Sequence, residues 1–319
     1  HNAGGFGLTG TDNVISCGSF TTDGSGNATV SLGYEPQWFL RKETSSANDW
    51  VIFDNMRGWS MTNDAFLYPN SSSAEASADR GNPTATGFTL TGQNASANFI
   101  YIAIRRGPMK VPTSGTSVFL PAIRAGTGAT ATTTNLSFPV DTVWSKGRDN
   151  GGTNSGDFDR LRGATQQLSL NQSDTEATAS TSLTGFDVMT GYTAGADAVQ
   201  LTINATGYNY VNWNFRRAPG FFDVVCYTGT GSATTVTHNL GVAPEFIQVK
   251  CRSNANGWAG YSAPTGNTKL INFADVDSAQ VSSNAWNNTS PTSSVFTVGT
   301  DNSVNGSART YVAYLFATV

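Results

Sequence analysis

A threefold internal repeat limits what this chain can fold into. The segments GYEPQWFLRK, SFPVDTVWSKGR and GVAPEFIQVKCR each place a proline shortly before an alternating apolar run that reaches a lysine. The three lysines, Lys42, Lys146 and Lys250, follow one another at intervals of 104 residues. Self-similarity at a fixed interval is the signature of tandem structural modules. The sequence therefore predicts three diverged copies of one module of about 105 residues.

The repeat also sets the expected domain boundaries. The Arg-Gly segments DNMRG and DRLRG follow the lysines of the first two copies, and YIAI, YVNW and YVAY come near the end of each copy. The third copy lacks the Arg-Gly segment and the Arg-Arg pair that ends the other two. The expected domains are residues 1–110, 111–221 and 222–319.

Each copy has the sequence pattern of β structure. QWFLRK, EFIQVK and YVAYLFA alternate with period two, which is typical of half-buried strands. Glycine-centred segments such as DGSG favour hairpins, and long Ser, Asn and Thr tracts favour surface loops. Only 13% of the residues are charged, against ~25% in an average soluble protein. The expected fold is all-β, with three tandem β-sandwich-like modules.

Two arginine pairs stand where one copy ends and the next begins. Arg105 and Arg106 close YIAIRR, Arg216 and Arg217 close YVNWNFRR, and a proline comes two residues after each pair. Proline cannot donate to a sheet ladder, so it ends the strand there. We expect these arginines at module junctions, where they can cap carbonyls or pair with a carboxylate. An anion-binding site is the alternative.

Signatures of catalysis and of metal binding are scarce. His238 sits at an expected hairpin edge, with no cysteine or carboxylate at ligand spacing. No nucleophile elbow, phosphate loop or dinucleotide fingerprint is present, so no metal or other cofactor is expected. Two carboxylate pairs, Asp54 with Asp64 and Asp157 with Asp159, have the residue types of a glycosidase. Because Asp54 and Asp159 both precede an Arg-Gly segment, structural Asp–Arg pairing is favoured.

Charge and hydropathy narrow the range of partners. The net charge of −4 gives no basic field for nucleic acid. No apolar stretch reaches the ~18 residues of a membrane span. The cysteines are too few for a disulfide scaffold and favour synthesis in a reducing cytoplasm. Because charges are few, the sheet edges are poorly guarded against pairing, which favours burial against other copies of the chain.

Several of these motifs, taken in order, resemble a known family. GYEPQWFLRKETSSANDWVIFDNMRG, YIAIRRGPMKVPT, FDRLRG, NFRRAPGFFDVV and HNLGVAPEFIQVK are similar to the repeated β-modules of tail-fibre and tail-tip proteins of tailed bacteriophages, marine phages in particular. The resemblance covers nearly the whole chain. It implies a non-enzymatic structural protein of the virion tail that is made in the host cytoplasm, assembles with other tail proteins and with itself as a homotrimer or larger, and meets the host surface.

Two other functions stay open beside this one. A polysaccharide depolymerase of the tailspike type would use carboxylates from the loops. A purely architectural virion component, such as a capsid decoration or tail attachment protein, would never touch a receptor. The resemblance implies no catalytic residues at positions of this chain.

Aromatic residues divide into an expected core and an expected binding surface. Those that recur between copies, Tyr101 with Tyr210 and Tyr311 and Trp50 with Trp258, are expected in the cores. Those without a counterpart lie in polar loops and are candidates for binding a host glycan or protein, since rings stack on sugar faces while amides bond the hydroxyls. Packing on the module or on a neighbouring chain is the alternative. The candidates are Trp59, Tyr68, Tyr192 and Trp286.

Overall fold

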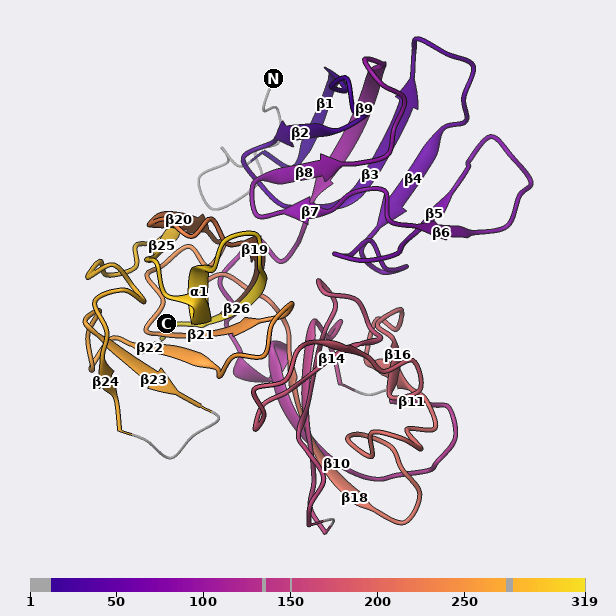
Figure 1. Cartoon of the computed structure of the whole chain (residues 1–319). Helices are drawn as coiled ribbons and strands as arrows, with labels where there is room; N and C mark the ends of the chain where they lie inside the picture. Colours follow the sequence, from indigo (N-terminus) through magenta and orange to yellow (C-terminus); the bar gives the residue numbers. More distant parts are fainter. Residues whose placement is uncertain (1–12, 134–135, 150, 274–277, 319) are drawn as a thin grey trace. The chain divides into compact units, whose positions relative to one another are not determined.

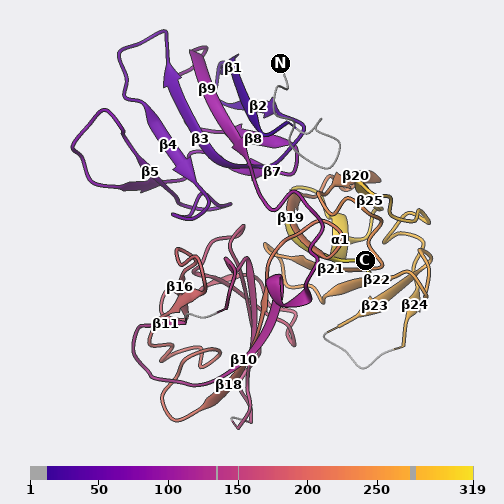
Figure 2. The same ribbon diagram turned by 180° about the vertical axis from the view of Figure 1, so that it is seen from behind.

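The chain is built almost entirely from antiparallel β-sheet (Figures 1 and 2). The computed structural model describes residues 13–133, 136–149, 151–273 and 278–318. Within them, twenty-six strands are joined by loops, the 3₁₀ turn η1 (Gly115–Ser117) and the short helix α1 (Asn302–Asn305). The expected all-β fold is confirmed. No helix in these ranges is long and apolar enough to pass through a bilayer.

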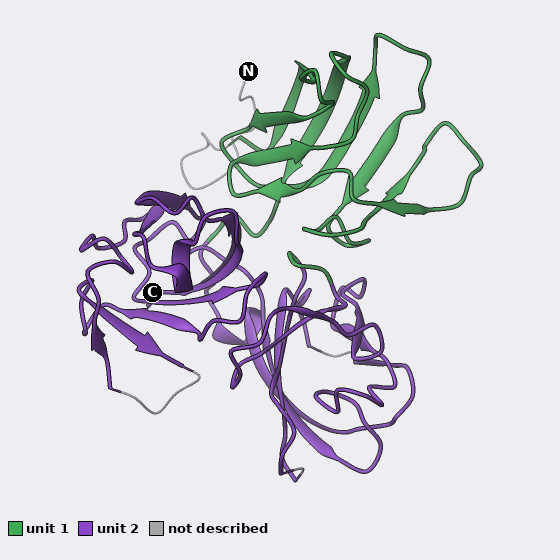
Figure 3. Ribbon diagram, in the orientation of Figure 1, with its two compact units in different colours: residues 1–110, 161–163 green, residues 111–160, 164–319 purple. Residues whose placement is uncertain are grey.

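The chain divides into two compact units (Figure 3). Unit 1 comprises residues 1–110 with the short segment 161–163, and unit 2 comprises residues 111–160 and 164–319. Unit 1 therefore contains the first expected domain. The second and third expected domains, 111–221 and 222–319, share unit 2.

The three modules contain large six-stranded sheets with one common strand order. In the first module the order is β1 (Ile15–Thr21), β9 (Asn98–Arg105), β3 (Pro36–Glu43), β4 (Val51–Asp54), β5 (Asp64–Leu67) and β6 (Ala76–Ala78). In the second it is β10 (Phe119–Ala125), β18 (Asn209–Phe215), β12 (Thr142–Gly147), β13 (Gly156–Asp159), β14 (Gln166–Ser169) and β15 (Ala177–Thr178). In the third it is β19 (Phe222–Thr228), β26 (Thr310–Phe316), β21 (Phe246–Cys251), β22 (Ala259–Ser262), β23 (Lys269–Asn272) and β24 (Gln280–Val281).

A smaller sheet belongs to each module and completes a sandwich-like arrangement. These sheets are β2 (Ala28–Ser31), β8 (Gly87–Leu90) and β7 (Pro83–Thr84) in the first module; β11 (Ala131–Thr133), β17 (Tyr192–Ala194) and β16 (Leu183–Gly185) in the second; and β20 (Thr234–Thr237) with β25 (Val295–Val298) in the third.

The core of each module lies between its large and its small sheet. In the first module, the rings of Phe39 on β3 and Phe88 on β8 lie 4.2 Å apart between centroids, and both side chains are fully buried. Val143 with Tyr192, and Ile247 with Phe296, join the two sheets in the second and third modules. Alternating apolar residues on the strands therefore supply one core per module, as the repeat predicted.

Backbone register aligns the three copies and corrects one expected equivalence. The amides of Arg105, Arg216 and Ala317 donate to the carbonyls of Val14, Val118 and Phe221, respectively. Arg105 is the last residue of β9, and Arg216 and Ala317 directly follow the equivalent strands β18 and β26. Counting back from these bonds matches Tyr210 and Tyr311 with Phe99. The expected partner, Tyr101, is displaced by two residues. Side chains two residues apart point to the same face of a strand. The expected alignment, although displaced by two residues, therefore still predicted the correct buried face.

The turn that contains the Arg-Gly segment in the first two copies keeps its backbone geometry in the third copy, which lacks the arginine. Gly58 and Gly163, in the Arg-Gly segments, have φ of 107° and 108°, a region open mainly to glycine. The register of β21 on β22 aligns Ser262 with Asp54 and Asp159. Gly266, four residues further on, has φ of 82°. The third copy therefore keeps the left-handed glycine at this position.

The recurring lysines hold carbonyl groups near the ends of their strands. The ammonium of Lys42 donates to the carbonyl of Asn48, and that of Lys146 donates to Thr153 at 2.6 Å. Lys250 donates to the carbonyls of Cys251 and Ser173. Burial lowers the pKa of Lys250 to about 8. These contacts explain why lysine recurs at the same interval.

Candidate functional site: a polar pocket in the first module

A polar pocket of about 230 Å³ opens in unit 1. Its walls come from β3, from the end of β5 and from the loops after β3, β6 and β8. We call it the Arg41 pocket. The lining side chains used below are Arg41, Glu43, Asn48, Asp49, Tyr68, Arg80, Gln93 and Asn94.

Arg41 is a buried cation whose side chain has no polar partner in the described part of the chain. It lies on β3, is 5% exposed, and its guanidinium carbon lies 5.2 Å from the centroid of the Phe99 ring. The Nε atom is buried without a hydrogen-bond acceptor. Burial, together with the nearby charge of Arg80, lowers the pKa of Arg41 to about 10, so the group stays protonated at neutral pH. A buried guanidinium in this state has donors available to a ligand.

Arg80 and Tyr68 share one aromatic support in the pocket. The guanidinium carbon of Arg80 lies 5.3 Å from the centroid of the Phe66 ring, and the Tyr68 ring meets the same phenylalanine edge-on at 5.5 Å. Both side chains are half-buried. Of the four aromatics expected to bind a receptor, Tyr68 is the one that lines this pocket.

Glu43 is committed to neutral hydrogen-bond donors. Its carboxylate accepts from the amide groups of Asn48 and Asn94 and from the hydroxyl of Ser45. Burial raises the pKa of Glu43, but these hydrogen bonds together outweigh burial and hold the pKa of its carboxyl below the ordinary value. The carboxylate is therefore ionised at neutral pH and already engaged.

The two arginines are specific to the first copy. In the strand register, Arg41 pairs with Val51. The equivalent pairs in the second and third copies are Ser145 with Gly156 and Val249 with Ala259. The other two copies therefore have serine and valine at the position of Arg41. The amide of Thr91, which follows β8, donates to the carbonyl of Arg80. At the equivalent place in the other two copies, the amides of Gly195 and Gly299 donate to the carbonyls of Ser182 and Ala285. Since the same sheet forms without either cation, the fold does not require them.

The other three receptor candidates lie in the cores, which corrects the expectation that they face a ligand. Trp59 and Trp286 are each 1% exposed, and their indole N–H groups donate to the carbonyls of Gly81 and Lys269 at 3.0 Å. Tyr192 on β17 is fully buried against the core of the second module. None of the three presents a ring face to solvent. These three residues have polar neighbours in the sequence, but in the folded chain their side chains are surrounded by apolar groups.

The pair Trp50 and Trp258 occupies equivalent positions with different exposure. Each precedes the first residue of a strand that pairs with the central strand of its sheet. Trp258 is fully buried and donates to the carbonyl of Ser169 at 2.8 Å, whereas Trp50 is half-buried. Only Trp258 therefore has the full burial expected of a core residue.

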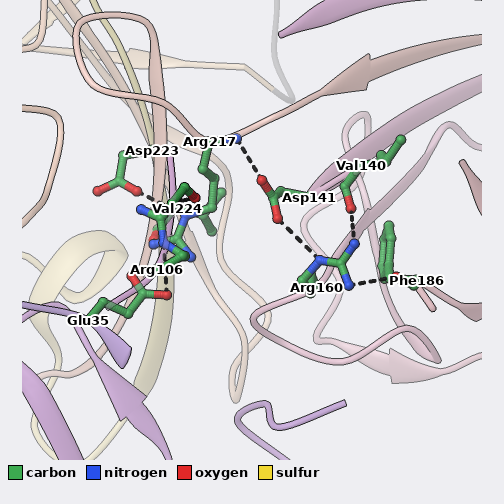
Figure 4. A network of polar contacts seen from close by, with 10 residues as sticks. Glu35, Arg106, Val140, Asp141, Arg160, Phe186, Arg217, Asp223 and Val224 are labelled. Atoms are coloured by element: carbon green, nitrogen blue, oxygen red, sulfur yellow. Dashed lines mark hydrogen bonds and ion pairs between the residues drawn. The ribbon is translucent and has the colours of Figure 1, made fainter. Parts of the chain in front are cut away.

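The arginine pairs lie where the chain leaves one module (Figure 4). Arg217 makes an ion pair with Asp223 at 2.9 Å and donates to the carbonyl of Val224 at 2.8 Å. Its backbone amide donates to Asp141, which also pairs with Arg160. Arg106 makes an ion pair with Glu35 at 3.2 Å. The backbone amides of Arg105 and Arg216 donate to the carbonyls of Val14 and Val118.

The carboxylates proposed as a glycosidase pair are buried between the second and third modules. Asp157 and Asp159 on β13 are both fully buried, and the hydroxyl of Tyr314 on β26 lies 2.8 and 2.7 Å from one oxygen of each. The centroids of the Trp144 and Tyr314 rings lie 6.0 Å apart. This cluster joins two modules of unit 2 and has no exposed surface for a substrate.

The second carboxylate pair is also structural. Asp54 makes an ion pair with Arg57 at 2.6 Å. Asp64 accepts the backbone amides of Arg80 at 2.9 Å and Ser60 at 3.2 Å, and burial raises its pKa to about 7. His238 is buried, with its ring nitrogens near backbone groups of Thr292 and Leu240. Across the described ranges, no group of three or more His, Cys, Asp or Glu residues is placed to hold a metal ion.

Comparison with known proteins identifies a family. A family model described as a domain of unknown function, DUF7483, matches residues 14–108 and 115–319. The matched ranges follow the repeat, beginning with the first module and continuing through the other two. No curated protein matches the chain.

Proposed function

The chain belongs to the DUF7483 family, and we propose that it is a non-enzymatic structural protein of a phage tail that binds a host-surface glycan through the Arg41 pocket. The observation that carries the binding role is the pocket itself, which brings amide groups, a tyrosine ring and an unpaired buried arginine to one cavity. The placement in a virion tail rests on the resemblance of the repeated motifs to tail-fibre modules.

The chemistry of the pocket suits a sugar. Asn48, Asn94 and Gln93 offer amide donors and acceptors, the groups that bond hydroxyls, and Tyr68 adds a ring with a polar tip. A pocket of 230 Å³ is smaller than the ~300–1,000 Å³ of drug-sized sites. The proposal is therefore recognition of one sugar residue of a larger glycan.

The depolymerase alternative is less well supported. Its carboxylates would have to reach a substrate, but Asp157 and Asp159 are fully buried beside Tyr314, and Asp54 is paired with Arg57. Incubation of the purified chain with host polysaccharide, followed by assay for new reducing ends, tests this alternative. The architectural alternative makes no use of the Arg41 pocket.

Binding should depend on Tyr68. On an array of bacterial surface polysaccharides, the wild-type chain is expected to be retained on a subset. Tyr68→Ala should weaken that retention about fivefold, since loss of one aromatic contact is worth on the order of 1 kcal/mol. Tyr208→Ala, at another half-buried tyrosine in the second module, is the matched control and should bind as wild type. Equal losses in both variants, or no retained polysaccharide, would contradict the proposal and favour the architectural role.

We also propose that copies of the chain assemble, as a homotrimer or larger. The edge strands β1 and β10 carry exposed isoleucines, Ile15 at 57% and Ile123 at 70%. Unpaired edges with apolar side chains favour pairing with another chain. Multi-angle light scattering at micromolar concentration should give at least three times the 33.6 kDa chain mass. A monodisperse monomer would refute assembly.

A further inference from the structure

We propose that the Arg41 pocket recognises the carboxylate of an acidic sugar, which is held between the guanidinium groups of Arg41 and Arg80. This inference rests on the proposed function, in which the pocket binds a glycan, and it names the chemical class of the sugar. A hexuronic acid has the required parts: one carboxylate, several hydroxyls and a compact ring.

The unused bonding capacity of Arg41 is the first argument. Its side chain is about nineteen-twentieths buried and has no ion pair or hydrogen bond in the described part of the chain, with Nε buried and unsatisfied. A buried cation is unfavourable unless it is paired and hydrogen-bonded. A guanidinium presents a planar fork of donors that matches a carboxylate. A ligand carboxylate would therefore supply the partner that the chain does not.

Convergence of a second cation is the second argument. The charge of Arg80 is close enough to disfavour the charged form of Arg41. Like charges brought together at a cavity repel, and an anion between them relieves the repulsion. Arg80 lies over Phe66, which orients its guanidinium without a hydrogen bond from that ring. Because the other two copies have serine and alanine at this position, the convergence belongs to the first module alone.

The two carboxylates of the pocket are held by other donors and offset the charge of the arginines only in part, since the charge of Glu43 favours the charged form of Arg41. Glu43 accepts bonds from Asn48, Asn94 and Ser45. Asp49 accepts the amide of Asn70 at 2.7 Å. Neither forms an ion pair within 4.0 Å of Arg41 or Arg80 among the described residues. The pocket therefore has a cationic side for a carboxylate and an amide side for hydroxyls.

Calorimetric titration of the full chain with small probes tests the inference. Glucuronate should bind at least about tenfold more tightly than glucuronamide, its neutral isostere, because a hydrogen bond to a charged group is worth a factor of ten or more. Acetate and inorganic phosphate should bind more weakly than glucuronate, since they lack the ring and hydroxyls.

Variants identify the groups responsible. Arg41→Gln and Arg80→Gln should each abolish the preference for glucuronate over glucuronamide, whereas Arg148→Gln, an equal charge change at an exposed site of the second module, should keep it. If Arg41→Gln fails to fold, Arg80→Gln decides, because among the described residues only the backbone groups of Arg80 make hydrogen bonds.

The possible failures are distinguishable. Equal binding of glucuronate and glucuronamide that is lost in Tyr68→Ala would overturn the acidic-sugar inference and leave glycan binding intact. Acetate or phosphate binding as tightly as glucuronate would identify a simple anion site and also overturn it. Absence of binding by every sugar probe, together with no polysaccharide retained on the array, would overturn both the inference and the proposed function.

Discussion

Replacing Trp286 with alanine should lower the free energy of unfolding of the third module by about 3–5 kcal/mol, the usual cost of emptying a large buried site. Its indole is 1% exposed, belongs to the main apolar cluster of this module, and meets the Tyr261 ring edge-on at 5.8 Å. Truncation also leaves the carbonyl of Lys269 without its indole donor. Guanidinium unfolding followed by circular dichroism measures the change.

Val281→Ala provides the control for this effect. Val281 lies on β24 of the same module and is 83% exposed, so its truncation should change stability by no more than about 0.5 kcal/mol. If Trp286→Ala were as mild as Val281→Ala while weakening glycan binding, the indole would be a contact residue and its assignment to the core would be wrong.

Arg217→Ala should destabilise unit 2 by about 3–5 kcal/mol, because removing one partner of a buried ion pair leaves the other charge uncompensated. The Arg217 and Asp223 side chains are 5% and 1% exposed. The same guanidinium also holds the carbonyl of Val224 where the chain enters the third module. Chemical denaturation of the variant and of the wild type gives the difference.

The neighbouring arginine is a matched control for this second change. Arg216 is half-buried and joins the fold through its backbone amide, so Arg216→Ala should cost less than about 1 kcal/mol. The double variant Arg217→Ala/Asp223→Ala should be more stable than Arg217→Ala alone, because it removes the buried unpaired charge. Equal effects of Arg216→Ala and Arg217→Ala would refute the buried-pair account.

The repeat made most of the fold predictable. Alternation with period two located the central strands, and the spacing of landmarks identified the three modules. Register was harder to predict, since Tyr101 and Phe99 lie on the same face of β9 and alternation does not distinguish them. The ion pair between Arg217 and Asp223 required knowledge of how the chain turns after the strand.

The failure at the aromatic residues has a physical cause. Trp286 appeared unrepeated because only aromatic identity was compared, but its position is equivalent to Leu183, which is also fully buried. Trp59 is equivalent to Ala164, which packs partly against the core of the second module. Diverged copies fill one core with side chains of different sizes, so lack of repetition does not indicate exposure.

The charged pocket was missed for a related reason. Arg41 lies in FLRKE, a run that predicts a strand, and Phe39, Arg41 and Glu43 alternate toward its buried face. Comparing the copies position by position would have found a cation where the others have serine and valine. Whether its guanidinium finds a partner depends on how distant loops meet, which the sequence does not reveal; in the part of the chain that the structure describes it has no hydrogen bond.

The common strand order has an evolutionary consequence. After a gene segment is duplicated, each daughter segment needs only apolar side chains on the inner faces of its own two sheets, and selection acts on the daughters separately. One daughter can then acquire charges at inward positions while its siblings keep neutral residues there and preserve the interface between them. In a chain of this kind, a binding site can arise in one copy after the fold is already established in all of them.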